Sequence, residues 1–124
     1  MSSLSLGKAI ISILNGVCMD KVYPIVANPE TTYPFIVYKR TGLTPANSKD
    51  RYNYKEMATV EVIVASDNYS KSLEMAEETK SKLEHTRGVF NNIEIGEVTM
   101  TAASEDYLDD AYIQRMTYQI EIIG

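Results

Sequence analysis

The chain of 124 residues has little of what most active sites need, because it contains one cysteine, one histidine and no tryptophan. The single cysteine, Cys18, excludes a disulfide within these residues, and with His85 alone it cannot complete a structural zinc site. No Ser–His–Asp arrangement is credible around one histidine, and no glycine-rich nucleotide-binding motif or P-loop occurs. The sequence therefore predicts a protein that is not an enzyme and has no cofactor.

Long apolar runs and clustered positive charge are also lacking. No run approaches the roughly 18 apolar residues of a membrane-spanning helix, so we expect no membrane partner. Twelve basic residues are scattered among seventeen acidic ones, for a net charge of -5. Proteins that bind nucleic acid concentrate Lys and Arg on one surface, so we expect no specific nucleic-acid binding. The length and the 44% hydrophobic content fit a single domain, residues 1–124, with its own core.

Two segments have the apolar spacing of amphipathic helices. The first covers residues 6–17, and the second covers residues 66–88, capped by Ser66 or Asp67 and ended by Gly88. The predicted buried stripes are Leu6, Ala9, Ile10, Ile13, Leu14 and Val17 in the first helix, and Tyr69, Leu73, Ala76 and Leu83 in the second.

Five other segments are typical of strands: residues 22–26, 34–40, 58–64, 92–103 and 111–123. Pro24 fits only a sheet edge, because proline has no N–H to donate. The apolar phase shifts at Gly96, which predicts a β-bulge or bend. Strands joined by short links tend to pair antiparallel, and helices then gather on one face. We therefore predict an α+β fold with an antiparallel sheet of about four to five strands and two helices packed on one face.

Residues 41–55, TGLTPANSKDRYNYK, form a polar segment that predicts a long connection. Connections of this length in compact domains are usually functional or disordered. Basic residues between tyrosines can bind single-stranded nucleic acid, but Tyr and Arg are also enriched at protein interfaces, which suits an acidic chain better. The interface candidates are Leu43, Pro45, Arg51, Tyr52 and Tyr54.

Residues 104–111, SEDYLDDA, are predicted to form an acidic connection between the last two strands. Glu105, Asp106, Asp109 and Asp110 could hold Ca²⁺ or Mg²⁺, although their spacing fits no EF-hand loop. An acidic hairpin tip that keeps strand edges soluble explains them equally well.

The segment VYPIVANPETTYPFIVYKR resembles the small tail completion proteins of long-tailed bacteriophages, which are relatives of the tail terminators. The resemblance continues through the polar loop, the Val-rich strand, the helix beginning SDNYSKSLEMAEE and the closing strand pair. It covers nearly the whole chain, and its motifs are prolines and alternation rather than a catalytic set.

The resemblance implies a structural, non-enzymatic protein of the virion tail, made in the cytoplasm of a bacterial host. It implies a ring, hexameric as relatives often are, which ends tube polymerisation at the head-proximal end of the tail. The implied partners are further copies of the chain, the major tail tube protein and the head-connector proteins. Three other readings stay open: a small-ligand-binding or regulatory α+β module, a small enzyme using a metal on the acidic cluster, and a host-encoded interaction protein with the same fold.

Overall fold

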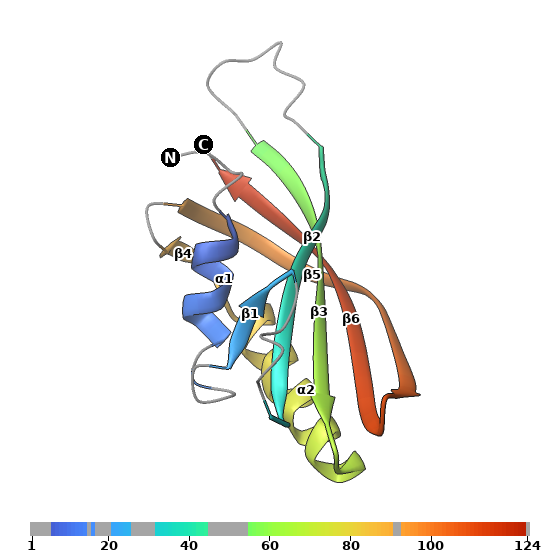
Figure 1. Ribbon diagram of the computed structural model, residues 1–124. Helices are drawn as coiled ribbons and strands as arrows, with labels where there is room; N and C mark the ends of the chain where they lie inside the picture. The colour runs from blue at the N-terminus through green and yellow to red at the C-terminus, as the bar shows by residue number, and fades with distance from the viewer. Residues whose placement is uncertain are drawn as a thin grey trace.

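The computed structural model describes residues 6–14, 16, 21–25, 32–44, 55–90 and 93–123 (Figure 1). The elements follow in the order α1 (Leu6–Leu14), β1 (Val22–Pro24), β2 (Phe35–Thr44), β3 (Lys55–Ser66), α2 (Tyr69–Glu84), β4 (Gly88–Phe90), β5 (Ile93–Leu108) and β6 (Ala111–Ile123). The α+β class is confirmed.

The strands form one six-stranded sheet in the order β1-β2-β3-β6-β5-β4, so β1 and β4 lie at its edges. About four to five strands were predicted, and the sixth was missed because β4 has only three residues, too few to show an alternation of apolar and polar side chains. Pro24 lies in an edge strand, as predicted.

The pairing of β1 with β2 is parallel, which corrects the expectation of a wholly antiparallel sheet. The rule that neighbouring strands pair antiparallel applies to short links, whereas residues 25–34 separate these two strands. A connection of that length can span roughly 30 Å, so it can return to the start of a three-residue strand. The other four pairings are antiparallel.

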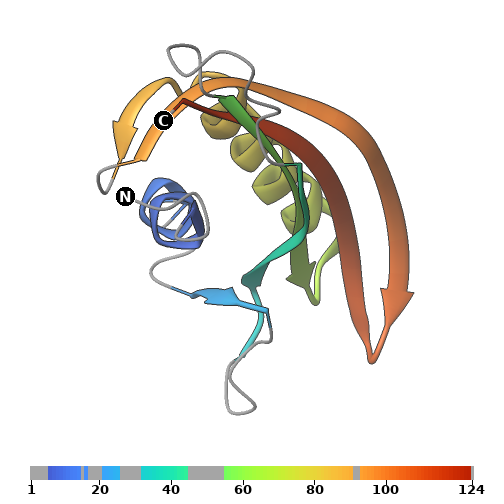
Figure 2. The same cartoon turned by 90° about the horizontal axis from the view of Figure 1, so that it is seen from above.

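Both helices pack on the same face of the sheet and share one core. In α1, four of the predicted residues are buried (Leu6, Ala9, Ile10 and Leu14), and Val17 lies outside the described residues. Gly7 permits close packing of α1, because a Cβ atom there would lie 2.9 Å from the Tyr38 ring. Figure 2 shows α1 inside the curve of the sheet.

The buried stripe of α2 differs from the predicted one. Ser72, Met75, Thr79 and Leu83 are buried, whereas Tyr69 and Leu73 are 44% and 37% exposed. The cap is Asn68, whose side chain accepts a hydrogen bond from the Lys71 N–H at 3.0 Å, rather than Ser66 or Asp67. Leu83 is buried as predicted and Ala76 packs partly buried against the core, whereas Ser72 and Thr79 take buried positions that the hydropathy pattern did not assign to polar residues.

The bulge predicted near Gly96 is confirmed by a register shift between Ile95 and Val98. The acidic connection is much shorter than predicted, because β5 continues to Leu108 and pairs with β6 throughout. Only Asp109 and Asp110 form the turn. Both have positive φ, 53° and 62°, as in the type I′ turns that match the twist of a hairpin.

The long connection predicted over residues 41–55 is also shorter than expected. Residues 41–44 belong to β2, whose pairing with β3 continues past a register shift between Arg40 and Gly42 to Thr44↔Met57. Residue 55 begins β3, and residues 45–54 lie outside the described residues.

Candidate assembly surface

The outer edge of β5 is open over most of its length. The short strand β4 pairs only with residues 93–95, and no described strand pairs with the outer side of residues 96–108. All side chains from residue 101 to residue 110 are exposed. A long, unpaired strand edge is a template for pairing with another chain, so it is a strong candidate for a contact surface.

A network of hydrogen bonds holds this exposed half of the hairpin on the start of α2. Glu105 Oε2 accepts hydrogen bonds from the Tyr69 hydroxyl at 2.7 Å and from Gln114 Nε2 at 3.0 Å. Gln114, which is buried, also donates to the Ser72 hydroxyl at 3.3 Å. Hydrogen bonds from Gln114 and Tyr69 lower the pKa of Glu105, because they stabilise its charged form. The open edge is therefore held in shape by side chains of its own chain.

The end of the hairpin combines apolar and acidic groups. Tyr107 and Leu108 are 56% and 52% exposed, next to the turn aspartates. The Tyr107 ring packs on Tyr112 with a centroid distance of 5.0 Å. The Tyr33 hydroxyl donates to the Asp109 carbonyl oxygen at 3.1 Å, which ties the turn to the segment before β2. Exposed aromatic and apolar residues at an ordered tip suit a protein contact.

At the other end of the strand order, β2 pairs with β1 through Ile36, Val37 and Tyr38. Further along β2, Lys39 and Thr44 have exposed side chains, and Leu43 is half-buried against the core.

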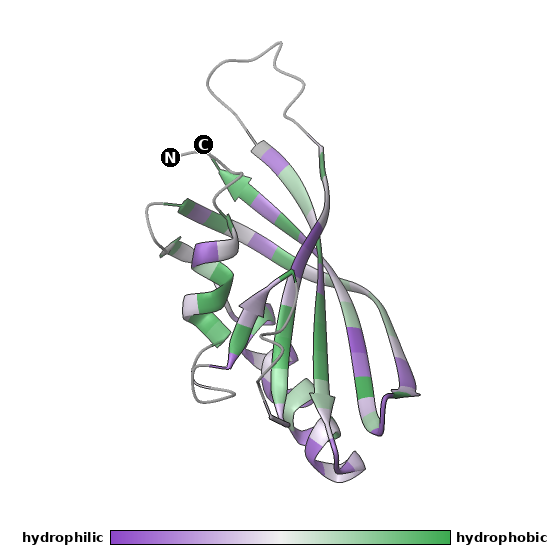
Figure 3. Cartoon of the chain, in the orientation of Figure 1, coloured by the Kyte–Doolittle hydropathy of each residue, from purple (hydrophilic) through white to green (hydrophobic). Residues whose placement is uncertain are grey.

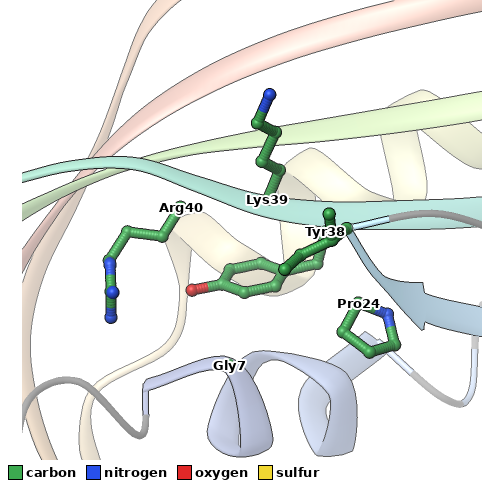
Figure 4. Close-up of a pocket in the computed structure, with 6 residues that line it drawn as sticks. Gly7, Pro24, Tyr38, Lys39 and Arg40 are labelled. Atoms are coloured by element: carbon green, nitrogen blue, oxygen red, sulfur yellow. The ribbon is translucent and has the colours of Figure 1, made fainter.

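A small open pocket of about 240 Å³ lies where β1 ends (Figure 4). Its lining residues are Gly7, Pro24, Ile25, Tyr38, Lys39 and Arg40, with the Tyr38 ring over α1 and Lys39 directed away from Arg40. The pKa of Tyr38 is raised, because burial disfavours the charged phenolate. The positive charge of Arg40 offsets part of this effect. The polar side chains among the lining residues are those of Tyr38, Lys39 and Arg40, which is little for a specific small-molecule site.

Ile25, beside this pocket, has an unusual backbone conformation. Its φ is 67°, a left-handed value that is costly for a β-branched residue, and its side chain is 66% exposed. Its N–H donates a hydrogen bond to the Tyr38 carbonyl oxygen at 2.6 Å, and this bond holds the chain against β2 where β1 ends. An exposed apolar side chain held in a strained conformation points to a contact with another molecule.

The sheet face opposite the helices carries no helix among the described residues. A small cluster lies there, in which buried Ala65, Ala111 and Ile113 pack with Tyr33, Phe35 and Ile63. The same face carries Glu61 and Arg115, whose side chains lie 3.7 Å apart. Figure 3 shows the resulting alternation of hydrophilic and hydrophobic residues along β6.

Among the interface candidates drawn from the sequence, only Leu43 is described, and it lies in β2. Pro45, Arg51, Tyr52 and Tyr54 lie outside the described residues. Sequence reasoning missed the open edge of β5, because it treated residues 104–111 as a connection. The available signal was the stretch just before this segment, where Val98, Thr99 and Thr101 favour extended structure. Nothing in the sequence indicated the unusual backbone conformation of Ile25.

No three His, Cys, Asp or Glu side chains within the described ranges are grouped as a metal site would require. His85 caps the end of α2, where its Nδ1 lies 2.7 Å from the Ser81 carbonyl oxygen, as expected of an imidazole at a helix C-terminus. None of the helices in the described part of the chain is long and apolar enough to span a membrane.

The fold defines a class of α+β proteins in which a curled sheet carries both helices on one face. The chain is similar in structure to a chain of the virion of a native gene transfer agent particle, with a TM-score of 0.72 over 96% of this chain and 95% of that chain. The two sequences are 12% identical, so the likeness establishes a shared fold. No protein-family model matches the sequence, and no curated protein matches it significantly.

Proposed function

We propose that this protein is a tail completion or tail terminator protein of a bacteriophage or prophage. In this role it is a single-domain structural protein of the virion tail, made in the bacterial cytoplasm, and it catalyses no reaction. Copies form a ring, hexameric as in the family it resembles, at the head-proximal end of the tail. The ring ends tube polymerisation and joins the tail to the head-connector proteins.

One observation carries this proposal: a chain from a virion has the same fold over nearly the full length of both chains. The sequence resemblance to tail completion proteins supports the same role independently of the structure. The surfaces of the described residues also suit assembly, because they consist of an open strand edge and an exposed hairpin end rather than a deep polar cleft.

The interface role of the segment around β2 and β3 belongs to this proposal. Leu43 lies in β2, and its partly buried side chain packs against the core. Pro45, Arg51, Tyr52 and Tyr54 follow it in the polar segment and would contact a neighbouring copy or the tail tube. Tyrosine and arginine are the residue types that interfaces favour.

The test is reconstitution with the major tail tube protein of the same genome. We expect the purified chain to cosediment with polymerised tubes and to appear as a ring at one end in negative-stain electron micrographs. Tubes assembled with the chain should be shorter than tubes assembled without it, because capped ends no longer grow. Tubes of unchanged length without the chain at their ends would refute the proposal.

A further inference from the structure

The outer edge of β5 is an open strand edge with charge of one sign, and we propose that it binds a positively charged, extended segment of another protein by strand addition. No described strand pairs with the outer side of residues 96–108, because β4 pairs only with residues 93–95. An edge of this kind accepts an extended peptide through main-chain hydrogen bonds, while side-chain contacts select the peptide. The inference names a kind of partner from this surface alone and goes beyond the proposed tail role.

The turn of the hairpin determines which backbone groups of β5 face away from β6. Leu108 and Ala111 flank the two-residue turn, and residues in this position of a hairpin exchange hydrogen bonds. Hydrogen-bonded and non-hydrogen-bonded pairs alternate along an antiparallel ladder, so Tyr107 belongs to a pair of the second kind. No register shift interrupts this part of the ladder, so the N–H groups of Ala103, Glu105 and Tyr107 face outwards, away from β6.

One of these three outward groups already has a carboxylate partner. Asp106 Oδ1 accepts a hydrogen bond from the Tyr107 N–H at 2.8 Å, which covers the edge at that point. The described residues provide no strand for the N–H groups of Ala103 and Glu105. A partner strand would bring carbonyl oxygens to all three groups, and the Asp106 carboxylate that it displaces would then be free to bind a cation of the partner.

The charge along this edge has one sign. Exposed acidic side chains occur throughout residues 93–112, which contain no lysine, arginine or histidine; they are Glu94, Glu97, Glu105, Asp106, Asp109 and Asp110. None of them forms an ion pair with a described residue. Arg115 of β6 lies opposite Ser104, but its guanidinium group is 3.7 Å from the Glu61 carboxylate. The edge therefore attracts a cationic strand and repels an anionic one.

Exposed aromatic and apolar side chains at the hairpin end add contact area for such a partner. Tyr107 and Leu108 are both more than half exposed, and the Tyr107 ring packs on Tyr112. Tyr69 of α2 also contacts Tyr112, with a centroid distance of 5.5 Å. The faces of tyrosine rings attract the cationic groups of lysine and arginine. Carboxylates and aromatic rings at one end of the strand thus select the same positively charged residues.

The negative charge also decides between possible occupants. Two β5 edges that met each other would bring carboxylates of the same sign together, so a second copy docked edge to edge is disfavoured. Nucleic acid and anionic lipid surfaces are repelled for the same reason. The occupant is therefore a segment of a different protein in which basic residues alternate with residues that favour a strand.

Synthetic peptides test this inference with the purified chain. The probe is a short fluorescent peptide in which lysine alternates with valine, and its anisotropy should rise on titration with the chain, with a Kd of about 100 μM or tighter at low salt. Added salt should weaken the binding, because it screens exposed charges.

Two matched peptides separate charge from strand addition. The first has glutamate in place of each lysine and should bind at least about ten-fold more weakly, because the edge repels it. The second keeps every lysine but is N-methylated on the residues that face β5. It should also bind about ten-fold more weakly, because it cannot donate main-chain hydrogen bonds to the edge.

A variant of the chain tests the role of the carboxylates. Asp106→Asn/Asp109→Asn/Asp110→Asn removes three negative charges from the end of the edge and keeps side chains of similar size. Asparagine accepts the positive φ of the two turn residues, so the variant should remain folded by circular dichroism. It should bind the lysine peptide about ten-fold more weakly than the parent.

The matched control changes the net charge by the same amount elsewhere. Glu74→Gln/Glu77→Gln/Glu78→Gln removes three carboxylates from exposed positions of α2. This variant should bind the lysine peptide like the parent, because these positions lie on a helix and not along the edge. An equal loss of binding in the two variants would mean that only the total charge of the chain matters, which would overturn the proposed location.

The remaining outcomes decide the other parts of the inference. Equal binding of the N-methylated and unmodified peptides would overturn strand addition, and equal binding of the glutamate and lysine peptides would overturn the cationic occupant. No rise in anisotropy with any peptide at chain concentrations up to about 1 mM would overturn the whole inference. Capping of tail tubes by the same chain would in that case leave the tail role standing, so the two proposals fail separately.

Discussion

At the level of single residues, Ile25 has a left-handed backbone conformation that lowers the stability of the fold. Replacing it with glycine should relieve the left-handed conformation and lose little burial, since the side chain is 66% exposed. We expect Ile25→Gly to raise the free energy of unfolding by about 0.5 to 1 kcal/mol. Urea denaturation measures this.

Val89 is the matched control for Ile25, because it is also β-branched and 67% exposed but lies in the short strand β4. Glycine in an ordinary strand conformation is unfavourable, so Val89→Gly should lower the free energy of unfolding by about 0.5 to 1 kcal/mol. Equal destabilisation by the two substitutions would mean that Ile25 carries no strain.

Glu105 makes the attachment of the hairpin to α2 sensitive to pH. Its pKa is lowered in the folded chain, so the carboxylate contributes stability that is present above its ordinary pKa of 4.5. This contribution is lost as the pH falls through the lowered pKa. Glu105→Gln should therefore show a weaker decline in stability than the parent below about pH 4.5, measured by urea denaturation between pH 7 and pH 3.

Glu97→Gln is the control, since the Glu97 side chain is exposed on the same strand and has no hydrogen bond to a side chain of another described residue. It should keep the pH dependence of the parent. If Glu105→Gln also keeps it, the hydrogen bonds from Tyr69 and Gln114 do not stabilise the charged carboxylate in solution.

At the level of elements, the β5–β6 hairpin has a turn that its residues do not favour. Type I′ turns prefer glycine at the second position, whereas Asp110 has a φ of 62° with a side chain present. Asp110→Gly should therefore stabilise the protein by about 0.5 to 1 kcal/mol. Thermal unfolding measures the change. Asp106→Gly, on the same exposed strand but outside the turn, should destabilise it, and stabilisation by both would show that the turn conformation is not the cause.

The elements also show what the sequence could and could not predict. β3 was predictable because Ala58, Val60, Val62 and Val64 alternate without a break and all are buried. The face of α2 was not, because buried Ser72 bonds its own helix, with its hydroxyl donating to the Tyr69 carbonyl oxygen at 2.7 Å. Hydropathy counts such a residue as polar, although its hydroxyl is satisfied locally.

The far end of β5 lay beyond the reach of hydropathy as well. Residues 104–108 are exposed, so no burial pattern marks them as a strand, and they extend β5 by pairing with β6. The parallel pairing of β1 depends on where a ten-residue connection leads, which no local pattern encodes. The candidate site was therefore hidden wherever pairing partners, rather than burial, determine the structure.

At the level of the whole molecule, the tail role predicts that folding and assembly can be separated. Deleting residues 45–53 leaves three residues, 54–56, between the last β2–β3 pair, Thr44 and Met57, which is enough for a hairpin loop. We expect the shortened chain to remain folded, by circular dichroism, yet to lose rings and tail joining. Normal rings and active particles from this variant would show that the segment containing Pro45, Arg51 and Tyr52 has no assembly role.

The half-paired state of β5 has a consequence for isotope exchange. In a single copy, β6 can satisfy only the amides on the inner side of β5, so roughly every second amide between residues 96 and 108 lacks a strand acceptor among the described residues. Those amides should take up deuterium within seconds, while their neighbours on the same strand are protected far longer. Occupation of that edge would abolish the alternation, so the deuterium pattern of one strand would show whether a copy stands alone or has a neighbour.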